Sequence, residues 1–113
     1  MGGSRRRASR AVPGADLKPF ADLIERQLAL FREDYADLIE QCDKAERAYD
    51  RAGREEAEER YATYLELVEE GREALEEIRD TYTRTLEAEP AETYEEAFDR
   101  EVGRHLPRFG LDG

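Results

Sequence analysis

Residues 17–49, LKPFADLIERQLALFREDYADLIEQCDKAERAY, decide the fold. Two interleaved sets of positions repeat every seven residues and hold only apolar or amphipathic side chains: Leu17, Ile24, Phe31, Leu38 and Ala45 in one set, and Ala21, Leu28, Tyr35, Cys42 and Tyr49 in the other. Alternating spacings of three and four residues are typical of a helix with one apolar seam. Because 42% of the chain is charged, an uninterrupted seam is a strong signal. The stretch predicts a helix over about residues 17–51.

A glycine separates this helix from a second one. If the first pattern were continued past Gly53, Glu59 and Glu66 would fall on the apolar seam, so the pattern breaks at the glycine. A new apolar stripe follows at helical spacing: Ala57, Tyr61, Tyr64, Val68, Gly71, Leu75, Ile78 and Tyr82. Two helices of similar length, about 17–51 and 55–88, predict a long antiparallel helical hairpin that resembles a coiled coil. One long helix with a stutter near Gly53 is the alternative.

The sequence predicts a short third helix over about residues 94–104. Pro90 is expected to end the second helix, and Thr93 with Glu96 forms a capping-box pattern. Apolar residues then recur every four positions: Tyr94, Phe98 and Val102. We expect this helix to fold over the open end of the hairpin near Phe20. A short apolar tail is expected to cap the same end, with docking on a partner as the alternative: Leu106, Phe109 and Leu111.

The first fifteen residues differ from the rest of the chain. They are rich in Gly, Ser, Arg and Pro and show no periodicity, so residues 1–15 are predicted to be a disordered tail and residues 16–113 a single helical domain. Four arginines in this tail are candidate contacts to nucleic acid: Arg5, Arg6, Arg7 and Arg10. The formal net charge of −11 opposes binding to a phosphate backbone, so this role is the weaker prediction.

Composition also indicates where the protein resides. The single cysteine, Cys42, rules out an intramolecular disulfide and suits a reducing compartment. No apolar run approaches the roughly 18 residues that a membrane span requires. The sequence therefore predicts a cytoplasmic protein that does not bind membranes.

No pattern of residues points to an enzyme. The only histidine, His105, follows Glu101 by four positions, whereas the Glu-x-x-His spacing of di-iron helical bundles is three. Cys42 lies on the apolar seam with no histidine nearby in sequence, and a buried cysteine is inert. The sequence predicts no catalytic residue, no metal ligand and no cofactor.

Tyrosines are the most informative side chains for function. All six fall on or beside the apolar stripes, and four of them form the candidate interaction surface: Tyr35, Tyr49, Tyr61 and Tyr64. Tyrosine is enriched at protein interfaces, and a chain of 113 residues with few large apolar side chains builds only a thin core. The sequence predicts a non-enzymatic interaction, scaffold or small regulatory protein that forms homo-oligomers, with a dimer favoured, and binds an unidentified protein. A nucleic-acid accessory protein is the alternative.

Overall fold

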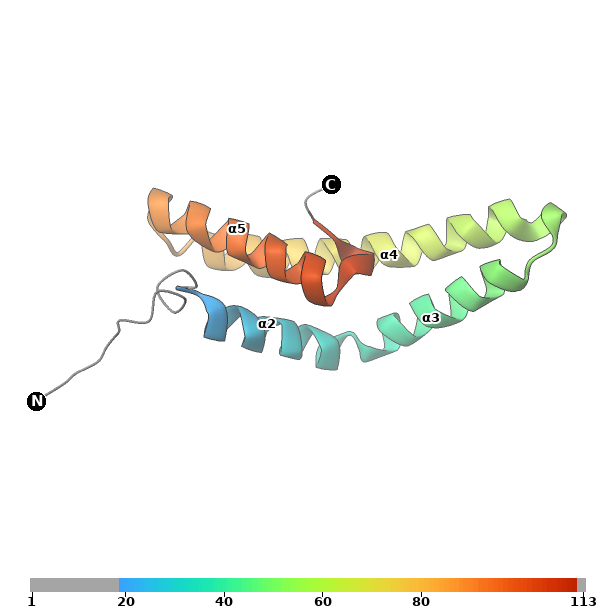
Figure 1. Cartoon of the computed structure of the whole chain (residues 1–113), viewed down its shortest axis with the longest axis horizontal. Coiled ribbons are helices and arrows are strands. Elements are labelled where there is room, and N and C mark those ends of the chain that lie inside the picture. The colour runs from blue at the N-terminus through green and yellow to red at the C-terminus, as the bar shows by residue number, and fades with distance from the viewer. Residues whose placement is uncertain (1–18, 112–113) are drawn as a thin grey trace, which may run out of the picture.

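A computed structural model describes residues 19–111, which are all-α and contain no strand. Four helices follow one another: α2 (Ala21–Asp34), α3 (Ala36–Arg51), α4 (Arg54–Thr83) and α5 (Ala88–His105), with a 3₁₀ turn, η1 (Pro107–Phe109), at the end (Figure 1). The predicted all-helical class is confirmed. The predicted N-terminal tail, residues 1–15, and its arginines lie outside the described residues.

The first predicted helix, about 17–51, is two helices that meet at Tyr35. This residue leaves helical geometry, with φ −114° and ψ 28°, and its ring stacks on Phe31 with centroids 5.0 Å apart. Hydrogen bonds continue across the junction, from Tyr35 N–H to the Phe31 carbonyl at 2.8 Å and from Ile39 N–H to the Tyr35 carbonyl at 3.0 Å. The axis changes direction there because the two halves have different partners: α2 packs on α5, and α3 runs beside α4 (Figure 1).

The boundary between the second and third predicted helices also differs, by more than one turn. α4 ends at Thr83 rather than residue 88, and α5 begins at Ala88 rather than residue 94. Pro90 is therefore the third residue of α5. Proline has no backbone N–H, and at this position an N–H would have no acceptor within the helix. Thr93 does not cap the helix, because its hydroxyl donates to the Glu89 carbonyl at 3.3 Å within α5.

The buried core gathers residues from every helix at the α5 end of the molecule. Its members are Ile24, Leu28, Phe31, Cys42, Val68, Leu75, Tyr94, Phe98, Val102 and Phe109. At the open end of the helices, Phe20 meets Tyr94 edge-on with ring centroids 5.4 Å apart, and Tyr82 lies 4.8 Å from Tyr94. α5 therefore covers the end of α2 that carries Phe20.

The C-terminal tail packs at a different place from the one expected. Phe109 lies against the middle of α4, where its Cδ1 would be 2.7 Å from a Cβ built on Gly71, and its ring meets Phe31 at 5.7 Å. The expected cap over the Phe20 end is wrong for Phe109. The absence of a side chain at Gly71 is what admits the ring, and it fixes the end of the chain to the centre of the core.

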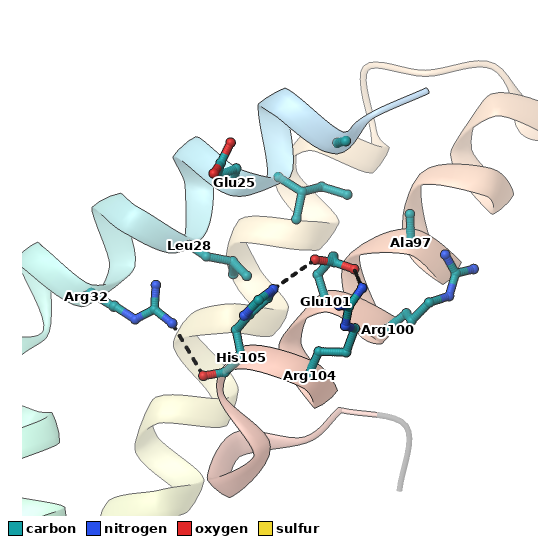
Figure 2. A pocket seen from close by; sticks show the side chains of 10 residues that line it. Glu25, Leu28, Arg32, Ala97, Arg100, Glu101, Arg104 and His105 are labelled. Atoms are coloured by element: carbon teal, nitrogen blue, oxygen red, sulfur yellow. Dashed lines mark hydrogen bonds and ion pairs between the residues drawn. The ribbon is translucent and has the colours of Figure 1, made fainter. Parts of the chain in front are cut away.

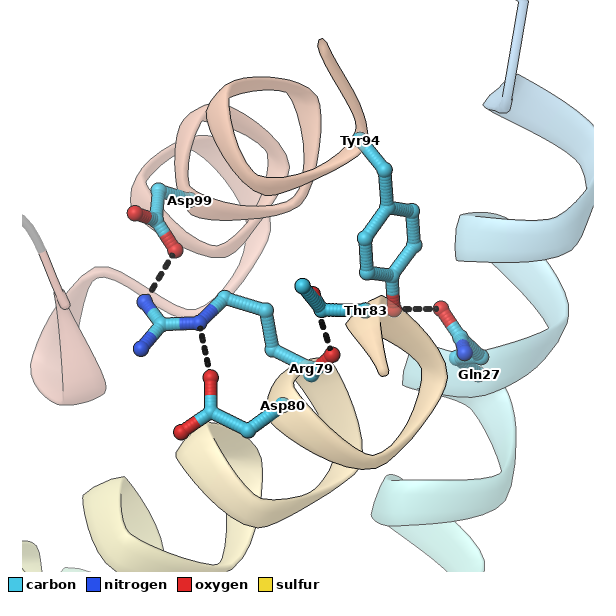
Figure 3. A network of polar contacts seen from close by, with 6 residues as sticks. All are labelled: Gln27, Arg79, Asp80, Thr83, Tyr94 and Asp99. Atoms are coloured by element: carbon cyan, nitrogen blue, oxygen red, sulfur yellow. Dashed lines mark hydrogen bonds and ion pairs between the residues drawn. The ribbon is translucent and has the colours of Figure 1, made fainter. Parts of the chain in front are cut away.

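A polar network connects α5 to both of its neighbours (Figure 3). The Arg79 guanidinium of α4 donates to Asp99 of α5 and to Asp80, each at 2.9 Å. On the other side, the Tyr94 hydroxyl donates to Gln27 of α2 at 2.8 Å. Tyr94 is fully buried, and this burial raises the pKa of its hydroxyl to about 12. The network orients α5 on a core that is otherwise apolar.

The raised pKa of Tyr94 predicts a loss of stability in alkali. An unfolded tyrosine ionises near pH 10, so between about pH 10 and 12 the unfolded state loses its proton before the native state does. Below pH 10 both states keep the proton, and the buried neutral hydroxyl makes its full contribution to the free energy of unfolding. The free energy of unfolding should fall across that window by about 2–3 kcal/mol. Urea unfolding from pH 8 upward checks this: Tyr94→Phe should flatten the fall, and the exposed Tyr61→Phe should not.

Candidate functional site

One half of the helical pair α3–α4 lies outside the core. We call residues 43–67 the arm; it comprises the C-terminal part of α3, the turn at Ala52–Gly53 and the first half of α4 (Figure 1). No side chain of the arm is buried, whereas Cys42 and Val68 on either side of it belong to the core. The two helices of the arm therefore contact each other without enclosing a core of their own.

Three of the four predicted tyrosines gather on one side of the arm. Tyr49 and Tyr61 have ring centroids 5.2 Å apart, and Tyr61 and Tyr64 have theirs 6.4 Å apart. Leu65 follows Tyr61 by four residues and so stands beside it on the helix surface. Tyr49, Tyr61 and Leu65 are 39%, 45% and 45% exposed. We call Tyr49, Tyr61, Tyr64 and Leu65 the tyrosine patch.

The fourth predicted tyrosine, Tyr35, lies elsewhere. It occupies the junction of α2 and α3, about 20 Å from Tyr49 at 1.5 Å per helical residue. Leu65 was not among the predicted site residues. Its place one turn from Tyr61 on a highly charged helix could have indicated that it belongs to the same exposed surface.

An arginine that the sequence analysis overlooked ties the C-terminus to the arm. Arg108 of η1 donates to Asp43 at 3.0 Å and to Glu46 at 2.7 Å, both on α3. It also donates to the Tyr64 hydroxyl at 3.2 Å on α4, and its guanidinium lies 5.7 Å from the centre of that ring. The side chain is only 22% exposed. A single residue therefore clamps the two helices where the arm leaves the core.

Removing this clamp should weaken the base of the arm. Arg108→Gln loses both carboxylate partners, and hydrogen bonds to charged groups each contribute about 1.5–3 kcal/mol when they are well formed. Since Asp43 and Glu46 are about half exposed, we expect a loss of about 1–2 kcal/mol. Chemical unfolding followed by circular dichroism measures it. Arg84→Gln, an exposed arginine at the end of α4, is the matched control and should change stability by less than about 0.5 kcal/mol.

The cysteine and the histidine, which often carry chemistry in proteins, lie in different surroundings here. Cys42 is fully buried, and burial raises the pKa of its thiol despite the attraction of nearby Arg108. His105 contacts Glu101 through Nε2 at 3.2 Å on the surface of α5. Among the described residues, no three His, Cys, Asp or Glu side chains come together as a metal site would require.

A groove with a volume of about 340 Å³ lies between α2 and α5 (Figure 2). Apolar and basic side chains both line it, among them Ile24, Leu28, Arg32, Arg100 and Arg104. Arg32 donates to the carbonyl of His105 at 3.3 Å, and Arg104 pairs with Glu101 at 3.5 Å. Cations near the last turn of a helix offset its dipole. Arg32 and Arg104 beside this groove therefore have a role within the chain, because they lie at the C-terminal end of α5.

Comparison with protein-family models, with curated proteins and with solved structures finds no match. Over residues 19–111, no helix combines the length and the apolar character that crossing a bilayer requires. In the part of the chain that the structure describes, the arm is the segment on which several large apolar and aromatic side chains stay exposed together: Tyr49, Tyr61 and Leu65.

Proposed function

We propose that this chain is a non-enzymatic helical interaction protein that acts through self-association and partner binding. In this proposal α3 and α4 form an antiparallel, coiled-coil-like hairpin, and its arm is the working surface. The observation that carries the proposal is the arm of residues 43–67, in which no side chain is buried.

Short helices are marginal in water on their own, and most helical stability in proteins comes from packing an apolar face. The arm presents such faces, and within residues 19–111 no third helix covers Tyr49, Tyr61 and Leu65, which are substantially exposed. Small helical domains commonly complete a thin core by association. Binding another chain would supply the missing cover.

Light scattering coupled to gel filtration tests self-association. The monomer mass is 13.1 kDa, and the apparent mass should rise toward twice that value as the protein concentration increases. A constant monomer mass over the whole concentration range, with a fully helical circular dichroism spectrum, would contradict self-association.

The tyrosine patch is the proposed surface for a different protein. Co-purification from the native source should recover a partner with the wild-type chain, and Tyr61→Ser should lose it. Leu30→Ser is the matched control, because Leu30 is an apolar side chain on α2 that is 56% exposed and remote from the arm. Equal recovery by Tyr61→Ser and wild type would remove the patch from the proposal.

Within this proposal the protein resides in the cytoplasm, as a lone buried cysteine suits a reducing compartment. The alternative function, nucleic-acid binding through Arg5, Arg6, Arg7 and Arg10, stays a prediction. Salt-dependent DNA binding that disappears on deletion of residues 1–12 would favour it. The absence of DNA binding at low salt would end it.

A further inference from the structure

The base of the arm holds an arginine between one aromatic ring and two carboxylates. The Arg108 guanidinium lies 5.7 Å from the centre of the Tyr64 ring, and it donates to Asp43 at 3.0 Å and to Glu46 at 2.7 Å. The electrons of an aromatic face attract a guanidinium, and carboxylates beside the ring accept its N–H groups. Rings and carboxylates of the arm therefore already bind one arginine of this chain.

The outer part of the arm repeats this combination of rings and carboxylates. Tyr49 and Tyr61 are exposed, and their ring centroids are 5.2 Å apart. Asp50 lies one turn beyond Glu46 on α3 and continues its row of carboxylates, and Glu58 stands one turn before Tyr61 on α4. Both added carboxylates are exposed, and the ion pairs in the part of the chain that the structure describes involve other acids. The outer arm thus has the chemistry to bind a second arginine.

We propose that the tyrosine patch binds an arginine from the N-terminal segment of a second copy of this chain, so that two copies exchange these segments. The inference rests on the proposed function, because it names the contact through which self-association occurs. The segment carries four arginines within six positions: Arg5, Arg6, Arg7 and Arg10. Charge favours the pairing, since residues 43–67 include eight acidic and five basic residues and the whole chain has a net charge of −11.

The length of the segment favours a second copy over the segment's own chain. Ala21 and Tyr49 stand at the two ends of the α2–α3 path, about 40 Å apart at 1.5 Å per residue. A fully extended chain spans at most about 3.5 Å per residue, so Arg10 reaches only about 30 Å from Pro19. Arg5 spans the distance only if nearly every residue between it and Pro19 is stretched. A second copy whose α2 begins beside the arm removes this limit, and a two-fold axis makes the exchange reciprocal.

Each contact between a segment and an arm is small, but the two contacts of a dimer act together. Once one segment is bound, the second contact forms within the same pair of molecules, at a high effective concentration. Salt screens exposed charges, so the dimer should dissociate as the salt concentration rises. The proposed function also places a different protein on the tyrosine patch. That protein and the segment of the second copy therefore exclude each other.

Sedimentation equilibrium of the full chain at low salt tests the exchange. A four-glutamine variant, with Arg5→Gln, Arg6→Gln, Arg7→Gln and Arg10→Gln, should raise the dimer Kd about tenfold or more, the loss expected when interface hot spots are removed. Lysine at the same four positions keeps the charge but not the planar guanidinium, so it should recover only part of the affinity.

Matched variants of the arm test the other side of the contact. Asp50→Asn with Glu58→Gln should weaken the dimer as the four-glutamine variant does. Glu59→Gln with Glu66→Gln is the control for net charge, because both residues are exposed and lie nearly half a turn around α4 from Tyr61. This control should leave the dimer Kd within about twofold of the wild type, since changes away from the contact have small effects.

Amide chemical shifts locate the contact. The four-glutamine variant, isotopically labelled, keeps the arm but carries no arginine in its segment. Adding an unlabelled Tyr61→Ser chain, whose segment is intact, should shift the labelled amides around Tyr49 and Tyr61. Adding the unlabelled four-glutamine variant should leave them in place. Equal shifts in the two additions, or no shift in either, would overturn the inference.

The outcomes separate this inference from the proposed function. A four-glutamine variant that dimerises as the wild type does overturns the exchange and leaves self-association standing. If the same variant loses only salt-dependent DNA binding, the arginines serve the nucleic-acid alternative and the exchange is wrong. A wild-type chain that stays monomeric contradicts both. Because the substituted carboxylates of the arm are exposed, their variants should keep the helical content and melting temperature of the wild-type monomer.

Discussion

Replacing Phe109 by alanine is expected to lower the free energy of unfolding by about 3–5 kcal/mol, the range for truncating a phenylalanine in a packed core. Phe109 is 2% exposed, meets Phe31 with ring centroids 5.7 Å apart and covers the bare backbone at Gly71. Urea unfolding followed by circular dichroism measures the change.

The same contact predicts that Gly71→Ala changes stability in opposite directions with and without the Phe109 ring. In the wild-type chain, Gly71→Ala places a methyl group against the Phe109 ring and should cost about 1–3 kcal/mol through overpacking. In the Phe109→Ala background the space is open, and alanine should then stabilise α4 by up to about 1 kcal/mol because glycine is a poor helix former. The double-mutant cycle isolates the coupling between the two residues.

Two results would contradict this account of the C-terminus. If Phe109→Ala changed stability by less than about 1 kcal/mol, the ring would not be a core residue in solution. If Gly71→Ala stabilised the wild-type chain, the ring would not occupy the space above the glycine. Gly103→Ala is the control for helix propensity alone, because nothing lies within 4 Å of a Cβ built there.

Periodicity predicted the helical class and the core-facing sides, but it did not locate the junctions. The apolar seam continues through Tyr35, so a pattern read along one chain cannot detect that α2 and α3 have different neighbours. The boundary near Pro90 was misplaced because proline is tolerated in the first turn of a helix as well as after its end. Thr93 fits a capping box in sequence but lies within α5.

The candidate site was predicted in part, for similar reasons. A stripe of tyrosines at helical spacing indicated the arm, since every member of such a stripe lies on one helix or its immediate neighbour. Arg108 was not predictable in this way, because its partners Asp43, Glu46 and Tyr64 stand on two other helices that only the tertiary fold brings together.

A matched pair of substitutions on α4 should separate the core from the arm. Leu75→Ala removes a fully buried side chain and should cost about 2–5 kcal/mol. Leu65→Ala removes one that is 45% exposed and should change stability by less than about 0.5 kcal/mol. Since both changes are leucine to alanine within one helix, the difference in helix propensity cancels and the comparison isolates burial.

Chemical unfolding of both variants must be measured at protein concentrations where the chain is monomeric, so that association does not contribute. Hydrogen exchange adds a second readout, because amides of residues 43–67 should exchange through local opening while those near Leu75 require larger-scale unfolding. A cost above about 1 kcal/mol for Leu65→Ala in the monomer would mean that the arm packs its own side chains. The arm would then need no second chain, and the physical motive for self-association would disappear.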